Sequence, residues 1–231
     1  MIKKHLDLLT TEAQKYYTSG GCSYHNWEHV SNVLTNSSLL ASSEFPSDTS
    51  EAMHMTDLTY ESIHIAALWH DAIYIPGAKN GVNEQASAAA LNSTWVKNNI
   101  PNTDKTLTDA MELIEYTAVS YHLNTYNFKG NLPFQILLDA DLSGLASDYN
   151  VFQQNQANII LENHGDPFSV EDNIKCGDFL EQFLLIRPFI YHTKTARDWY
   201  EYKARANIIK YVAQYRKFTI SSIYTSPYLA L

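Results

Sequence analysis

His70 and Asp71 stand side by side in AALWHDAIY, an apolar stretch that spans residues 66–74. Upstream, apolar residues such as Ile63 and Ala66 recur at helical spacing, which places His70 on the helix face that should pack into a core. Burying an ionised carboxylate beside an imidazole is costly unless something pairs with both groups. A structural hydrogen bond could supply that partner, and so could a metal ion.

The same combination returns in ILLDADLSGLA, residues 136–146, where Asp139 and Asp141 interrupt an apolar segment. A further histidine, His29, lies in YHNWEHV on a separate predicted helix. Each signal alone also fits a buried histidine or a carboxylate that bonds to the backbone. Together, two imidazoles and two carboxylates from three helices would form an N₂O₂ ligand set that neutralises one divalent ion. Such mixed ligation suits Mn, Fe, Co, Ni or Zn and, less well, Mg.

Helices must position these side chains, because helical periodicity runs through most of the chain. Asn26 is the expected N-cap of the helix that carries His29. Asp57 is the expected N-cap of the helix that carries His70 and Asp71.

Between those two helices, the polar segment 41–57 is broken by Pro46 and predicts a loop. Only FTISSIY, residues 218–224, has an ambiguous strand pattern. No repeat or long linker divides the chain, which predicts one all-α domain over residues 1–231. Further helices are predicted over residues 3–18, 82–99, 104–120, 132–146, 148–163, 173–192 and 195–218.

The composition argues against several classes of protein. No run of 18 or more apolar residues occurs, and the N-terminus lacks the apolar core of a signal peptide, so no membrane association is expected. Two cysteines are too few for a disulfide framework, and a cytoplasmic protein is therefore expected. The net charge of −9 argues against nucleic acid as a partner.

The order His29, His70–Asp71, Asp141 resembles that of the HD superfamily of metal-dependent phosphohydrolases, all-α proteins named after the adjacent histidine and aspartate. The segments YHNWEHV, AALWHDAIY, NEQAS, LDADLSGLA, IYHT and KARANI are similar to a bacterial subfamily of predicted phosphohydrolases, over about residues 16–210. The resemblance implies an HD-type helical bundle in which His29, His70, Asp71 and Asp141 are the metal ligands.

Two features of the ligand set follow from the same resemblance. Asp139 is the alternative for the last ligand, and Asp141 is preferred because the family pattern places the ligand after LDA. Only His122 lies between the HD pair and the last aspartate. Because two-metal members of the superfamily carry extra histidines in that interval, one divalent metal ion is expected.

Attack on phosphorus also needs a proton carrier and groups that stabilise charge. Glu84 in NEQAS is the candidate acid or base, or alternatively a carboxylate favoured by a helix N-terminus, with Asn83 as the helix cap. His25, in the turn before the helix of His29, is a candidate phosphate contact or a surface histidine. His122 is a candidate contact to the substrate or a hydrogen-bond donor behind the ligands.

The basic residues gather near the C-terminus. Residues 1–186 contain 8 lysines, no arginine and 23 acidic residues, whereas all four arginines lie within residues 187–217. Arg205 in KARANI is the candidate substrate ligand, because a planar guanidinium can bind phosphate oxygens in a bidentate manner. The alternative is that Arg205 pairs with an acidic group and docks its helix.

These residues predict a metal-dependent phosphohydrolase that releases phosphate from a small phosphorylated substrate, with a nucleotide as one candidate. The alternative is a catalytically inactive HD-like helical module that binds a nucleotide or a protein partner. An HD-like iron oxygenase is disfavoured, because it needs more histidine and carboxylate ligands. Motifs such as HExxH, GxSxG, Walker A and the dinucleotide fingerprint are absent. The substrate, the physiological metal and the oligomeric state stay open.

Overall fold

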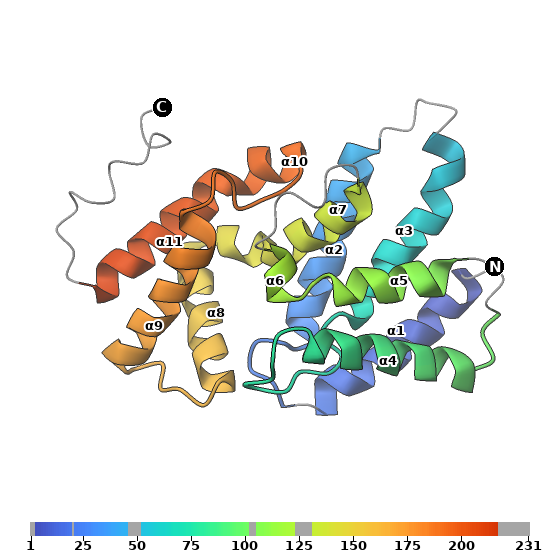
Figure 1. Cartoon of the computed structure of the whole chain (residues 1–231), viewed down its shortest axis with the longest axis horizontal. Helices are drawn as coiled ribbons and strands as arrows, with labels where there is room; N and C mark the ends of the chain where they lie inside the picture. The colour runs from blue at the N-terminus through green and yellow to red at the C-terminus, as the bar shows by residue number, and fades with distance from the viewer. Residues whose placement is uncertain (1–2, 20, 46–51, 102–104, 123–130, 217–231) are drawn as a thin grey trace.

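The computed structural model describes residues 3–19, 21–45, 52–101, 105–122 and 131–216. These residues form helices joined by turns, and no β-strand occurs among them, so the predicted all-α fold is confirmed (Figure 1). The first half of the chain contributes α1 (Lys3–Ser19), α2 (Trp27–Glu44), α3 (Ala52–Trp69), α4 (Val82–Lys97), α5 (Thr106–Glu115) and α6 (Val119–His122). The second half contributes α7 (Leu132–Asp141), the 3₁₀ turn η1 (Leu142–Ala146), α8 (Tyr149–Glu162), α9 (Val170–Leu180), the π-helical turn η2 (Glu181–Leu185), α10 (Lys194–Ala196), the π-helical turn η3 (Arg197–Glu201) and α11 (Tyr202–Tyr215).

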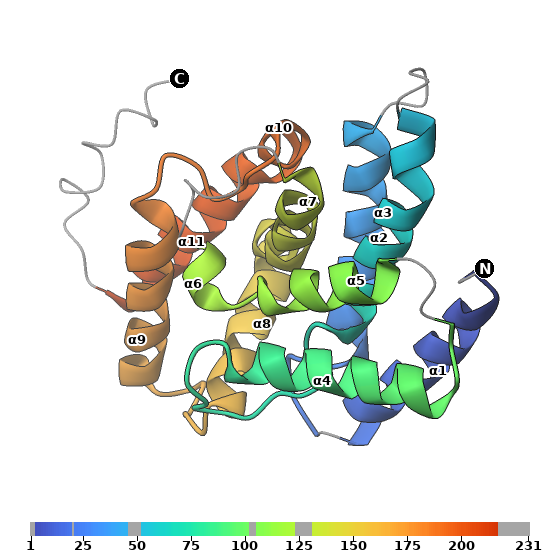
Figure 2. The same ribbon diagram turned by 45° about the vertical axis from the view of Figure 1, so that its right-hand side comes forward.

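The helices form two neighbouring groups, with α7 between them (Figures 1 and 2). In the first group α2 packs against α3, and α5 packs against both α3 and α4. In the second group α9 packs against α8 and α11, while α7 packs on α2 and continues directly into η1. Buried side chains from both groups, among them Leu40, Trp69, Ile136 and Tyr211, belong to one hydrophobic core. In the described part of the chain, no helix combines the length and the apolar character needed to cross a membrane.

The helix that carries His29 begins where the sequence predicts. The side-chain oxygen of Asn26 accepts hydrogen bonds from the backbone N–H groups of Glu28 and His29, as an N-cap does. The predicted loop over 41–57 is too long, because α2 continues to Glu44 and α3 already begins at Ala52. Asp57 therefore lies inside α3, and the prediction that it caps this helix is wrong.

Other predicted helices are interrupted at positions that lack a clear stop signal in the sequence. The range 104–120 divides into α5 and α6, and the range 132–146 changes from α-helix to 3₁₀ turn after Asp141. The range 173–192 begins earlier, at Val170, and ends at Leu185, close to Pro188, whose ring disfavours a helical residue before it. The ambiguous segment 218–224 lies outside the described residues.

Candidate metal centre

The end of α3 fixes the orientation of His70. Its side chain is only 1% exposed and follows the fully buried Leu68 and Trp69. The Nδ1 atom lies 2.9 Å from the carbonyl oxygen of Ala67, to which it can only donate. The hydroxyl of Tyr17 donates to the carbonyl of Leu68 at 2.9 Å, which ties the same turn to α1. With Nδ1 used in this way, Nε2 carries the lone pair that a metal ion would need.

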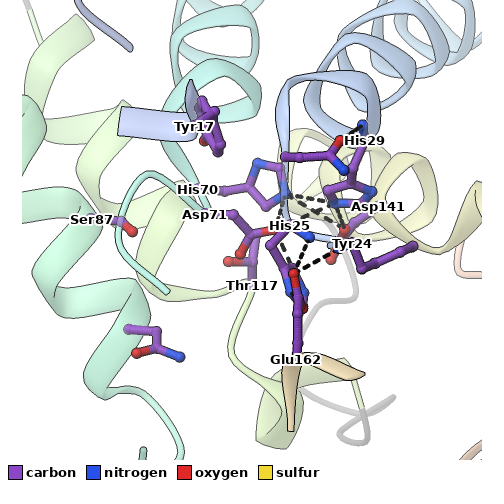
Figure 3. Close-up of polar contacts among 12 residues, drawn as sticks. Tyr17, Tyr24, His25, His29, His70, Asp71, Ser87, Thr117, Asp141 and Glu162 are labelled. Atoms are coloured by element: carbon purple, nitrogen blue, oxygen red, sulfur yellow. Dashed lines mark hydrogen bonds and ion pairs between the residues drawn. The ribbon is translucent and has the colours of Figure 1, made fainter. Parts of the chain in front are cut away.

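Four side chains from α2, the end of α3 and the end of α7 converge on one point (Figure 3). The Nε2 atoms of His29 and His70 are 3.3 Å apart. The Oδ2 atom of Asp71 lies 3.0 Å from Nε2 of His70 and 3.3 Å from Nε2 of His29. The Oδ1 atom of Asp141 lies 3.2 Å from Nε2 of His29 and 3.6 Å from Nε2 of His70. The structure thus brings together the four residues that the sequence nominates as ligands.

These separations fit one ion. With bonds of about 2.0–2.2 Å, neighbouring ligand atoms around a transition metal stand about 2.9–3.6 Å apart, depending on the coordination geometry. The four ligand atoms of this cluster all lie within 4.8 Å of one another. The two histidines are 8% and 1% exposed, whereas Asp71 and Asp141 are 15% and 19% exposed. An ion held here would be open to solvent on the carboxylate side.

The cluster is electrostatically coupled. Burial alone would lower the pKa of His29, but hydrogen bonds with Asp141 and Asp71 raise that pKa. Burial acts in the same way on His70, and the charge of Asp71 raises the pKa of that imidazole well above its usual range. Burial would raise the pKa of Asp71, but the neighbouring charges of His70 and His25 hold it well below its usual range. Because imidazoles bind a metal ion in their neutral form, metal affinity is expected to fall as the pH falls.

Asp139 does not belong to this cluster, although the sequence offers it as the alternative ligand. Its two carboxylate oxygens accept hydrogen bonds from the backbone N–H groups of His192 and Thr193, both at 2.7 Å. The side chain is fully buried, and burial raises its pKa to about 7 against the effect of these hydrogen bonds. Asp139 therefore holds the segment before α10 against α7, and Asp141 is the aspartate that faces the histidines.

Replacing Asp139 by alanine is expected to destabilise the protein by about 2–4 kcal/mol, because two buried N–H groups lose their acceptors. Metal affinity should change less than twofold. Denaturant unfolding and metal titration of Asp139→Ala and Asp141→Ala test this prediction. Asp141→Ala should lose metal affinity while its stability changes little. A loss of metal binding in folded Asp139→Ala would contradict the assignment.

His25 lies in the turn before α2, as predicted, and the structure adds a partner that the sequence analysis missed. Nδ1 of His25 lies 2.6 Å from Oε2 of Glu162, the last residue of α8. The other carboxylate oxygen of Glu162 accepts the backbone N–H groups of Tyr24 and His25 at 2.7 and 2.8 Å. The ring of Tyr74 stacks on His25 with centroids 3.9 Å apart. Nε2 of His25 is thereby aimed at Asp71, 4.0 Å away, at the edge of the cluster (Figure 3).

The segment NEQAS supports the loop that follows the HD pair. The Oγ atom of Ser87 accepts the backbone N–H of Ile73 and donates to its carbonyl, at 3.0 and 3.3 Å. The amide of Asn83 pairs in the same double manner with the backbone of Ile75. Asn83 is therefore not the helix cap that the sequence predicts, since α4 begins after Gly81. The side chains of Asn83 and Ser87 thus both hydrogen-bond to the backbone of the preceding loop. These contacts explain the spacing of the two residues without a catalytic role.

Glu84 lies in the first turn of α4 and faces a pocket of about 790 Å³. The same pocket is lined by Asp71, Asp141 and His25. A second pocket, of about 680 Å³, reaches Asp141 and His29 from the side of α2 and α8. The position of Glu84 is therefore compatible with both interpretations, a proton carrier and a carboxylate at a helix N-terminus. The residue lies in the first turn of α4, and it also lines the pocket beside the cluster.

The structure does not bring Arg205 to either of these pockets. Its Nε atom donates to Glu201 at 2.6 Å. The remaining guanidinium nitrogens donate to the carbonyls of Leu185, Arg187 and Pro188 at 2.7–3.1 Å. The prediction that Arg205 contacts the substrate is corrected in favour of its alternative, in which it pairs with an acidic group and docks its helix.

His122 ends α6, but its side chain lies outside the described part of the structure, so its predicted role has no structural counterpart. A scan of the chain against models of protein families finds no match, and a search among curated proteins finds none either. The resemblance to the HD superfamily accordingly stays a prediction, and the functional argument rests on the geometry of His29, His70, Asp71 and Asp141.

Proposed function

We propose that this protein is a metal-dependent phosphohydrolase that acts on a small phosphorylated substrate. The observation that supports this most strongly is the convergence of His29, His70, Asp71 and Asp141, of which Asp71 and Asp141 line a pocket of about 790 Å³. Two neutral imidazoles and two carboxylates leave a bound divalent ion near neutral, with coordination positions to spare on the exposed carboxylate side. Such an ion would polarise a phosphoryl group and make a water molecule a better nucleophile.

The chain supplies other groups for the reaction in the same pocket. His25 presents Nε2 to the space beside Asp71, where the protonated ring can donate a hydrogen bond to a phosphate oxygen or to the departing oxygen. Glu84 also lines this pocket and can take or return a proton. Glu162 is a positioning residue, because it holds His25 by two separate contacts.

A screen of phosphomonoesters and nucleotides with Mn²⁺, Co²⁺, Ni²⁺ and Mg²⁺ tests the proposal by following phosphate release. We expect metal-dependent turnover that disappears with EDTA and in Asp141→Ala. Asp148→Ala is the matched control, since this carboxylate is 87% exposed and pairs with Lys203 at the surface. Absence of turnover together with absence of metal binding would favour the non-catalytic helical module.

Replacing Glu162 by glutamine is expected to lower kcat about tenfold, because the amide can no longer accept the Nδ1–H of His25 in the same orientation. Metal affinity should stay within twofold of the parent protein. Steady-state kinetics on Glu162→Gln, His25→Ala and the double variant check this. If the two losses multiply in the double variant, Glu162 does not act through His25.

A further inference from the structure

The pocket beside the metal cluster is lined by both polar and apolar side chains. Its polar residues include Asp71 of the cluster, His25 and Glu84. Its apolar residues come mainly from η1, α8, α9 and η2 and include Leu145, Ile159, Phe179 and Leu184. Polar residues of α8 and α9, among them Gln156, Asp172 and Lys175, also line it. These elements belong to the second helical group, in which α8 and α9 stand side by side (Figures 1 and 2).

The charges of this pocket do not suit a polyphosphate. Among the described residues that line it, Lys175 is the only lysine or arginine, and it pairs with Glu171 at 2.9 Å and with Asp172 at 3.1 Å. Asp172 also lines the pocket, together with Glu84. Arg205, the arginine that could have balanced further phosphates, is bound to Glu201 and to backbone carbonyls. A chain of three phosphates would therefore meet more negative than positive charge.

We propose that the substrate is a phosphomonoester whose organic part is an apolar, preferably aryl, group that packs against Leu145, Ile159, Phe179 and Leu184. The inference rests on the proposed function, because the cluster must hold the phosphate end. The other pocket fits such a group less well, since amide side chains such as Asn32, Asn150 and Asn158 line it. The 790 Å³ volume accommodates a ring system beside the phosphate.

Two phosphonates of equal head-group chemistry test the inference without turnover. Calorimetric titration of the Mn²⁺-loaded protein should show phenylphosphonate binding about tenfold tighter than methylphosphonate, because only the phenyl ring covers the apolar wall. Phe179→Ala should reduce this ratio to less than about threefold. Phe189→Ala is the matched control, because Phe179 and Phe189 are 43% and 40% exposed and only Phe179 lines the pocket. Equal affinities in the parent protein would overturn the inference.

Hydrolysis of phenyl phosphate, glycerol phosphate and ATP, measured beside these titrations, separates the two proposals. The inference expects kcat/KM to be highest for phenyl phosphate, at least about tenfold above ATP. Tight phenylphosphonate binding without any turnover would refute the hydrolase and leave the ligand class standing. Turnover that favours ATP or glycerol phosphate would refute the ligand class and leave the hydrolase standing. Failure of both phosphonates to bind the loaded protein would overturn the inference.

Discussion

Alanine in place of Asp71 should abolish metal binding and turnover together. Its Oδ2 atom lies 3.0 Å from Nε2 of His70 and 3.3 Å from Nε2 of His29, so it would be a ligand atom of an ion bound in the cluster. Removing one of four protein ligands and its negative charge is expected to weaken the affinity for Mn²⁺ at least about 100-fold. Calorimetry with Mn²⁺ and assays of phosphate release measure the two losses.

The metal-free Asp71→Ala protein should differ from its parent by no more than about 1 kcal/mol, because losing the ion pair with His70 is offset by removing a desolvated carboxylate. This stability control shows that the variant is folded. Asp148→Ala, which removes an exposed carboxylate, should bind Mn²⁺ like the parent protein. Full turnover in Asp71→Ala would make the metal assignment wrong.

Alanine in place of Arg205 should have the largest effect on stability, a loss of about 3–5 kcal/mol, because Glu201 and three backbone carbonyls lose a largely buried partner. The side chains of Arg205 and Glu201 are only 16% and 13% exposed. Glu201 would also keep its own bonds to the backbone N–H groups of Ile190 and Tyr191 without the balancing charge. Thermal and urea unfolding of Arg205→Ala measure the loss.

Two variants make this result specific. Arg205→Lys retains the charge but cannot reach Glu201 and three carbonyls at once, so it should also be destabilised. Lys203→Ala on the same helix breaks an exposed pair with Asp148 and should change stability by no more than about 0.5 kcal/mol. A marked rise in KM for Arg205→Lys at unchanged stability would instead restore Arg205 as a phosphate contact.

The parts of the site that could be predicted are those with a local signature. His29, His70, Asp71 and Asp141 are polar residues at inward positions of apolar helices, and that pattern made them candidates. The resemblance to the HD superfamily then favoured Asp141 over Asp139 as the last ligand. Asn26 was recognisable as an N-cap from its place before an apolar periodic segment, and the structure confirms it.

The same signature is ambiguous for Asp139, because a buried carboxylate can meet either an ion or backbone N–H groups. The donors that settle the matter belong to His192 and Thr193, which are 53 and 54 residues further along the chain. Contacts at that distance depend on how α7 packs against the segment before α10. No local pattern around Asp139 contains this information.

The sequence around Glu162 and Arg205 contains local signals that point to the partners of these two residues. Glu162 stands at the last position of α8, where the helix dipole disfavours a negative charge, and such a residue usually has a compensating partner. That partner, His25, is 137 residues away in sequence. Arg205 follows Glu201 by four residues, the spacing of a helical ion pair, and this local pairing favours the docking role over the phosphate role.

A crystal of the protein soaked in Mn²⁺ and measured for anomalous scattering tests the central claim most directly. We expect one anomalous peak per chain, about 2.0–2.3 Å from Nε2 of His29 and of His70 and from a carboxylate oxygen of Asp71 and of Asp141. The absence of a peak among these four side chains, or a peak coordinated elsewhere, would contradict it.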